Sequence, residues 1–170
     1  MRRTTFVIIV LVGLAIIAAL TASYQKNSSG ELSAATGNAQ AAVDVPFTRI
    51  TEGLQSSVTK PVNYLITSES ELAALWKIVK ATGEPPSIDF TQEAVIAVFA
   101  GERPTAGYSI AVSKVADVEG KRLVTISLMQ PASDCVTAQV ITAPYEILRL
   151  PATPLPLTHE DTVATVNCSE

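Results

Sequence analysis

The apolar and polar positions of the chain follow two different periods, and the longer period marks one helix. Four apolar residues recur at the i, i+3, i+4 and i+7 spacing of an amphipathic helix: Leu72, Leu75, Trp76 and Val79. Ser68 followed by Glu71 has the form of a capping box, in which the hydroxyl accepts a hydrogen bond from the N3 amide. Gly83, ahead of two prolines, ends the pattern. The sequence predicts one helix from Ser68 toward Gly83, with Trp76 as a core residue.

A period of two, or an unbroken apolar run, marks strands in most of the remaining sequence. Ala94–Ala100 contains no polar residue, which is typical of a central strand covered on both faces. On either side of a turn at Glu119–Gly120, apolar and polar residues alternate in 108–113 and 123–128. Further strands are expected at 61–67, 136–142, 145–150 and 162–166. These elements predict an α+β fold, predominantly antiparallel β, with a sandwich- or barrel-like sheet, one packed helix and hairpins between sequence neighbours.

The N-terminus has a different pattern, an apolar helix without a polar face. Phe6–Leu20 contains no charged residue and follows Arg2 and Arg3. This arrangement is typical of a cleaved signal peptide or of a retained signal anchor, and both keep the arginines inside and the later residues outside the cytoplasm. We expect the signal anchor or signal peptide at residues 1–23 and a membrane-anchored domain that is periplasmic or at the cell surface.

The residues after this segment divide into a linker and a domain. Residues 24–45 are small, polar and without periodicity, and such a segment buries too little apolar surface to order itself. We expect a flexible linker there. The β-rich domain is expected at residues 46–170, and at about 125 residues it is large enough to fold around its own core without a metal.

Charge and composition exclude several classes of function. The chain has 12 basic and 16 acidic residues, and without Arg2 and Arg3 the remainder carries 10 against 16, a net charge of −6. Such a domain lacks the basic surface that nucleic acid requires. One histidine and two cysteines are too few for a four-coordinate zinc site, and no phosphate-binding, dinucleotide-binding or nucleophile-elbow motif occurs. We expect no catalytic residue, metal or cofactor, and interpret His159–Asp161 as a solvated acidic turn.

The two cysteines are compatible with a position outside the cytoplasm. Cys135 and Cys168 are far apart in sequence and belong to no Cys-x-x-Cys motif. In an oxidising space two such cysteines are most simply one disulfide, which would attach the C-terminal tail to the fold. The alternative is two buried or unpaired thiols without a role.

The loop after the apolar run is the main candidate for a binding site. In Phe99–Ile110, Pro104 fixes one φ angle and Gly107 allows a positive φ or a close backbone approach. A rigid, exposed loop at the end of a sheet suits contact with a protein partner, whereas the alternative is a turn that only shapes the sheet. The candidate protein-binding residues are Glu102, Arg103, Pro104, Thr105, Ala106, Gly107 and Tyr108 of this loop, with Thr142, Pro144 and Tyr145 of a second bend.

The same loop resembles the central motif of the protease-complex subunit PrcB family, in its C-terminal domain. That motif is an apolar strand, Gly, two or three polar residues, Thr-Gly-Gly-Tyr and an alternating strand. Further blocks agree upstream, at Leu75–Trp76 and Asp89–Phe90, and downstream at Gln139–Tyr145, so the resemblance spans Phe47–Leu150. Two features depart from the family: Ala106 stands where the first glycine of the pair would be, and the lipid-accepting cysteine of many members is absent.

The resemblance implies a non-catalytic subunit that associates with or stabilises a secreted protease, and it transfers no catalytic residue. Pro104–Tyr108 also resembles the Asn-Pro-Thr-Thr-Gly-Tyr loop of chagasin-type cysteine-protease inhibitors, which are immunoglobulin-like sandwiches. Protease inhibition is therefore an alternative function, although the two further loops of those inhibitors have no counterpart here. A structural domain of the cell envelope without a protease partner is another.

Overall fold

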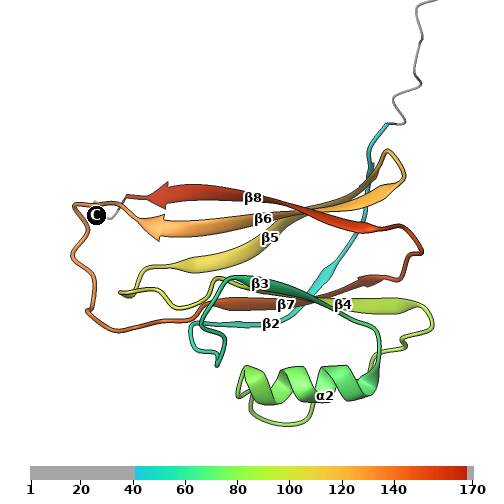
Figure 1. Ribbon diagram of the computed structural model, residues 1–170, viewed down its shortest axis with the longest axis horizontal. Helices are drawn as coiled ribbons and strands as arrows, with labels where there is room; N and C mark the ends of the chain where they lie inside the picture. Colours follow the sequence, from blue (N-terminus) through green and yellow to red (C-terminus); the bar gives the residue numbers. More distant parts are fainter. Residues whose placement is uncertain (1–40, 168–170) are drawn as a thin grey trace, which may run out of the picture. The chain divides into compact units, whose positions relative to one another are not determined.

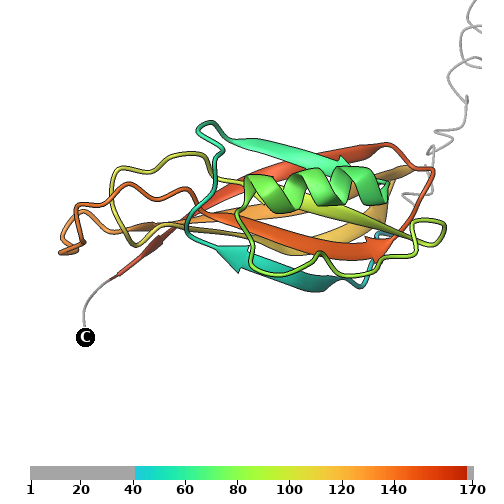
Figure 2. The same ribbon diagram turned by 90° about the horizontal axis from the view of Figure 1, so that it is seen from below.

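The computed structural model describes residues 41–167, which form two four-stranded sheets and one helix (Figure 1). The first sheet has the strand order β1-β5-β6-β8 and the second has the order β2-β7-β4-β3. The sheets lie face to face, and α2 lies across the outer face of the second sheet (Figures 1 and 2). In chain order the elements are β1 (Val43–Asp44), β2 (Thr48–Gly53), β3 (Val62–Ile66), α2 (Glu69–Ile78), β4 (Glu93–Phe99), β5 (Ser109–Val118), β6 (Lys121–Pro131), β7 (Tyr145–Pro151) and β8 (Leu157–Val166).

The centre of the second sheet is buried on both faces. In β4, Val95 and Phe99 pack in the cluster that contains the helix, whereas Ile96 and Val98 pack in the cluster between the two sheets. β4 pairs antiparallel with β7 on one side and with β3 on the other. The two-sided central strand predicted from the unbroken apolar run is confirmed.

Hydrogen bonds at its N-terminus and a left-handed residue after its C-terminus set the bounds of α2. The Ser68 hydroxyl accepts a hydrogen bond from the Glu71 amide at 3.3 Å, and the Glu71 carboxylate accepts one from the Thr67 amide at 2.8 Å. This carboxylate hydrogen bond lowers the pKa of Glu71 below its usual 4.5. The helix ends at Ile78, earlier than expected, because Lys80 already adopts the left-handed conformation with φ of 51°.

The apolar stripe of α2 packs on the second sheet. Leu72 and Leu75 are each 2% exposed, and Val79 is 3% exposed. Trp76 is partly buried against the same cluster, which also contains Phe99 of β4. The predicted stripe, and the role of Trp76 as a core residue, are confirmed.

The tertiary structure corrects several strand predictions. β8 begins at Leu157 rather than at 162 and pairs parallel with β6, whereas all the other strand pairs are antiparallel. β1 and β2 were not predicted, and β1, with the buried Val45 after it, lies in the segment assigned to the linker. Among the neighbours in sequence only β5 and β6 form a tight hairpin, and its turn is at Glu119–Gly120 as predicted.

The segment 136–142, predicted as a strand, is not one. Its only strand-like pairing is an isolated bridge between Thr142 and Arg103. Val136 is fully exposed, and Val140 and Ile141 are largely exposed. An alternating sequence forms a strand only where a neighbouring strand accepts its hydrogen bonds, and here the segment crosses from the end of β6 to the start of β7.

A buried carboxylate joins the two sheets. Glu146 of β7 is fully buried and, by strand alternation, lies on the face that packs against the first sheet with Leu148. Its carboxylate accepts a hydrogen bond from the Val112 amide of β5 and another from the Arg49 guanidinium of β2. β5 is bulged between Val112 and Lys114, and a bulge interrupts the ladder of backbone hydrogen bonds. Glu146 therefore supplies the acceptor that the bulged strand needs inside the core.

Arg49 neutralises this buried charge from the edge of the second sheet. Its side chain is 49% exposed, and its Nε lies 3.3 Å from the exposed Glu52 carboxylate as well as beside the buried Glu146. The hydrogen bond to Glu146 raises the pKa of Arg49 above its usual value. The pair thus places one anion in the core and keeps its cation in partial contact with water.

Arg49→Ala is expected to lower the free energy of unfolding by about 3 kcal/mol, because it leaves the Glu146 carboxylate buried without its cation. In a Glu146→Gln background the same change is expected to cost less than about 1 kcal/mol, since a neutral amide needs no cation. Urea denaturation of the four proteins measures this coupling. Arg149→Ala, which removes an exposed pair with Glu93, is the control. Equal losses of unfolding free energy in the two backgrounds would contradict the role of Arg49 as the cation that neutralises Glu146.

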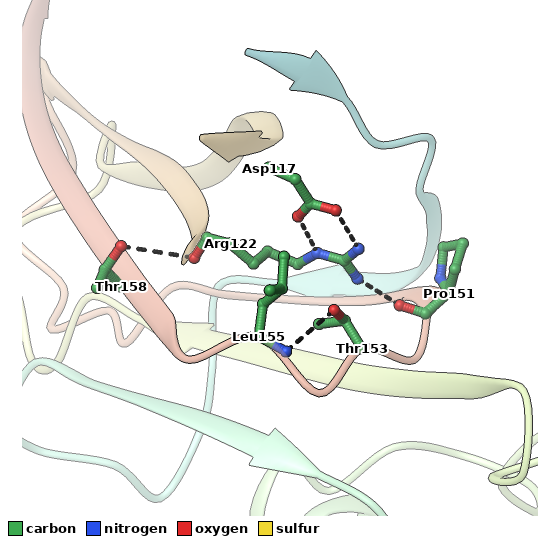
Figure 3. Close-up of polar contacts among 6 residues, drawn as sticks. All are labelled: Asp117, Arg122, Pro151, Thr153, Leu155 and Thr158. Carbon is green, nitrogen blue, oxygen red and sulfur yellow. Dashed lines mark hydrogen bonds and ion pairs between the residues drawn. The ribbon is translucent and has the colours of Figure 1, made fainter. Parts of the chain in front are cut away.

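A buried cation joins the two sheets near the β5–β6 turn. Arg122 of β6 is 5% exposed, and its guanidinium donates to both carboxylate oxygens of Asp117, at 2.7 and 2.9 Å (Figure 3). Its Nη1 donates to the carbonyl oxygen of Pro151, the last residue of β7 in the opposite sheet. The hydrogen bonds from Arg122 lower the pKa of Asp117 below its usual 3.8.

Asp117→Asn is expected to destabilise the protein by about 2 kcal/mol at neutral pH, because it removes a charged acceptor from Arg122. A carboxylate with a lowered folded-state pKa stabilises the fold above its unfolded pKa and loses that contribution as the pH falls through the folded value. The difference between the two proteins should therefore shrink below pH 3.8. Urea midpoints across this range measure it, with the exposed Asp44→Asn as control. A difference independent of pH would refute the linkage.

Some predictions lie outside the described residues, namely those for residues 1–40 and for Cys168. Between residues 41 and 167, no helix is long and apolar enough to cross a membrane. Cys135 is not a free thiol. Its Sγ lies 3.6 Å from the carbonyl oxygen of Val166, so the chain that leads to Cys168 passes beside it. The disulfide between Cys135 and Cys168 stays a prediction.

Candidate functional site

One end of the sandwich is formed by two loops that are hydrogen-bonded to each other. The β4–β5 loop comprises residues 100–108 and the β6–β7 loop comprises residues 132–144. Arg103 and Thr142 exchange two backbone hydrogen bonds, of 2.7 and 3.0 Å. The Thr142 hydroxyl also donates to the Thr105 carbonyl oxygen at 3.1 Å. The two bends singled out in the sequence therefore meet at one end of the sandwich.

Arg103 is the polar centre of this end. Its Nη2 donates to the Ala100 carbonyl oxygen at 2.7 Å, and its Cζ lies 5.8 Å from the centroid of the Tyr108 ring, within the range of a cation–π contact. Its buried Nε has no hydrogen-bond partner within residues 41–167. Such an unpaired buried N–H group is rare, and because this nitrogen has almost no contact with solvent, an acceptor from outside cannot reach it in this conformation.

Gly107 shapes the β4–β5 loop. Its φ is +92°, and a Cβ there would lie 3.3 Å from the ring of Pro131 and 3.4 Å from Thr137. The prediction of a positive φ or a close approach is confirmed, and both hold. Ala106, which replaces a glycine of the family motif, has no positive φ and donates its amide to the Ala138 carbonyl oxygen at 3.0 Å. The departure from the motif is therefore compatible with this loop.

A second glycine, which the sequence did not single out, brings the loop against the start of β3. Gly101 has a φ of +72°, and a Cβ there would lie 2.8 Å from backbone atoms of Lys60 and Pro61. The neighbouring Glu102 amide donates to the Thr59 carbonyl oxygen at 3.1 Å. The β4–β5 loop thus rests directly on the backbone that leads into the edge of the second sheet.

Gly101→Ala and Gly120→Ala form a matched pair, because both glycines have a φ of +72° and only Gly101 has atoms within 4 Å of the added Cβ. Each change is expected to cost about 1 kcal/mol for the left-handed backbone. Gly101→Ala should cost a further 1 kcal/mol or more, roughly the cost of overpacking. Urea denaturation compares the two variants. Equal losses of unfolding free energy would mean that the loop is not in tight contact with the backbone at the start of β3.

The structure separates the predicted contact residues by exposure. Thr142 is 4% exposed, Tyr145 is 7% exposed and Pro144 is fully buried. The Tyr145 ring stacks on Phe99 with 6.0 Å between the ring centroids. By contrast, Glu102 to Tyr108 are all exposed or half-buried. Exposed apolar side chains that the sequence had assigned to a strand adjoin them: Val136, Val140 and Ile141.

A groove that the sequence did not indicate leads away from Arg103 along one edge of the sandwich. It lies between β3 and β8, which are the last strands of the two sheets. Its widest part has a volume of about 540 Å³, and it continues past Leu65 and Leu157 into hollows of about 170 and 90 Å³. Its lining includes the apolar residues Phe99, Ile110, Ile126 and Leu128 and, from the two edge strands, Val62, Asn63, His159, Asp161 and Val163.

The histidine lies in a wall of this groove and not in a turn. His159 and Asp161 are in β8, so the predicted acidic turn is wrong. His159 Nδ1 lies 3.0 Å from Asp161 Oδ1, and the two side chains are 53% and 62% exposed. In the part of the chain that the structure describes, no three His, Cys, Asp or Glu side chains are grouped as a metal site would require. The groove therefore offers the His159–Asp161 pair, Asn63 and Arg103 on an otherwise largely apolar surface.

A comparison with protein families identifies the segment that carries both loops. Residues 94–151 match the family model described as PrcB C-terminal. The domain is PrcB C-terminal-like over this segment. The match runs from β4 to β7 and confirms the resemblance there, whereas Leu75–Trp76 and Asp89–Phe90 lie outside it. Neither curated proteins nor solved structures gave a match.

Proposed function

We propose that this protein is a non-catalytic, extracytoplasmic binding subunit that associates with a secreted protease and stabilises it. The observation that carries the proposal is the match of residues 94–151 to the PrcB C-terminal family. The matched segment contains the β4–β5 loop, the β6–β7 loop and the strands that hold them. The candidate contact surface thus lies inside the PrcB C-terminal-like segment.

The β4–β5 loop is the proposed contact surface. Glycines with positive φ and the bonds to the β6–β7 loop hold it in one conformation, and a preordered loop loses little conformational entropy when a partner binds. Val140 and Ile141, which lie beside the bridge between Arg103 and Thr142, add exposed apolar area. An apolar patch with a polar, charged rim is the usual anatomy of a protein interface.

Binding is favoured over catalysis by the chemistry of the groove. The His159–Asp161 pair is largely exposed to solvent, whereas acid–base pairs in active sites are usually enclosed. One hydroxyl of the groove lining, that of Thr162, donates to the Ile126 carbonyl oxygen at 3.2 Å. The proposed position outside the cytoplasm rests on the apolar segment within residues 1–23 and on the predicted disulfide.

Affinity isolation of the full chain from its native envelope, after mild cross-linking, is expected to recover a secreted protease that keeps its activity. Glu102→Lys, which reverses a charge on the contact loop, should lower the recovery about tenfold. The control is Glu119→Lys, an equally exposed glutamate at the opposite end of β5. Protease recovery is measured by mass spectrometry and by activity of the eluate.

Two results would contradict the proposed subunit. Loss of protease activity when the purified chain is titrated against papain-like or subtilisin-like enzymes to a stoichiometric ratio would favour the chagasin-like inhibitor. Recovery of envelope components without any protease would favour a structural domain. Equal recovery with Glu102→Lys and with Glu119→Lys would remove the β4–β5 loop from the interface.

A further inference from the structure

We propose that the groove between β3 and β8 receives an extended segment of the partner polypeptide, with apolar side chains at alternate positions and a carboxylate at the Arg103 end. This inference deepens the proposed function, since it rests on a polypeptide partner. It assigns the groove, rather than only the loops, to recognition.

Apolar side chains that face the interior are uncovered along this edge. Val163 of β8 lies opposite Leu128 of β6, and Leu65 of β3 lies opposite Ile96 of β4. Leu128 and Ile96 belong to the core between the sheets, and residues paired across strands share a face. Val163 and Leu65 therefore also face inward, yet they are 63% and 47% exposed. The sandwich lacks the cover that another extended segment would provide.

The backbone at this edge favours an extended polypeptide as the occupant. β3 and β8 are the last strands of their sheets within residues 41–167, and alternate N–H and C=O groups of an edge strand point outward. β8 is ten residues long, so a strand of similar length could pair along it. An added strand forms hydrogen bonds with the edge backbone and places every second side chain in the groove. A small apolar molecule would fill the groove but leave the backbone groups of the edge strands without a partner.

The charge at the end of the groove selects a carboxylate. Arg103 lines the widest part of the groove, and among the described residues its guanidinium forms no ion pair. The acidic residue in the same lining, Asp161, is paired with His159. Ala100 and Tyr108 hold the guanidinium in place. An arginine that is oriented but unpaired is the group that binds an incoming carboxylate most strongly.

A partner segment suits the groove better than a second copy of this chain. Edge-to-edge pairing of two copies of β8 about a twofold axis would bring Glu160 and Asp161 of each copy near those of the other, and like charges across strands are destabilising. The chain itself enters the first sheet at β1, at the edge opposite β8. A foreign strand can have uncharged residues opposite Glu160 and Asp161 and keep its carboxylate at Arg103.

The test uses the full chain in detergent micelles and a fluorescent peptide of the length of β8, in which valine alternates with threonine. One form has a free C-terminal carboxylate, one has a glutamate beside an amidated C-terminus, and one is amidated and uncharged. The two carboxylate forms are expected to bind saturably and more tightly than the neutral form. Hydrogen exchange should show new protection in β3 and β8.

Two matched valines locate the binding site. Val163→Asp should weaken binding about 100-fold, because the complex would bury an unpaired charge. Val43→Asp should leave it unchanged, since Val43 is 62% exposed and lies on β1, the opposite edge strand of the same sheet. Arg103→Gln should remove the preference for a carboxylate, and Arg103→Lys should restore part of it.

Several results would overturn the inference. They are the absence of saturable binding, equal losses in the two valine variants, a carboxylate preference that does not depend on Arg103, or a dimer that dissociates with Val163→Asp. If no peptide binds but the protease is still recovered, and its recovery still falls with Glu102→Lys, the groove assignment fails and the proposed function stands. If the peptide binds as described but no protease is recovered, the groove assignment stands and the protease partner is wrong.

Discussion

The architecture depends on one constraint, the burial of the β4–β7 pair on both of its faces. Val95 and Phe99 on one face, and Ile96 and Val98 on the other, all require cover. The helix supplies it outside and the first sheet supplies it inside, so that residues 41–167 form three layers (Figure 1). The cover decreases toward β3 and β8, where inward-facing Leu65 is left largely exposed, so the same constraint that builds the core also creates the groove at its edge.

Two buried charged side chains, Glu146 and Arg122, fix how the sheets are placed on each other through hydrogen bonds to backbone groups of the opposite sheet. Apolar packing alone leaves two sheets free to slide, because it is not directional. Glu146 joins β7 to the bulged β5, and Arg122 joins the end of the β5–β6 hairpin to Pro151 at the other end of β7. Because each contact is directional and costly to leave unpaired, together they specify one register between the layers.

The candidate surfaces are continuous with each other through Arg103. Its backbone pairs with Thr142 and so joins the two loops, while its side chain lines the groove. A partner that contacted Glu102 on the loop would therefore be placed to insert a strand along β8. The match to the PrcB C-terminal family covers the loops and β4 to β7 but not β3 or β8, which form the groove walls. The loops are thus shared with the family model, and the groove walls come from outside the matched residues.

The sequence by itself determined the elements whose signals are local. The capping box at Ser68 and the apolar stripe after it specify α2, the unbroken run of β4 specifies a strand covered twice, and Gly107 specifies the loop conformation. Only the tertiary structure decided which strands pair, that 136–142 forms no strand, and that His159 lies in a groove wall. Those outcomes depend on contacts between residues distant in sequence. An alternating pattern shows that one face can be buried, but its pairing partner, its direction and the open edge beside it are set by how the layers stack.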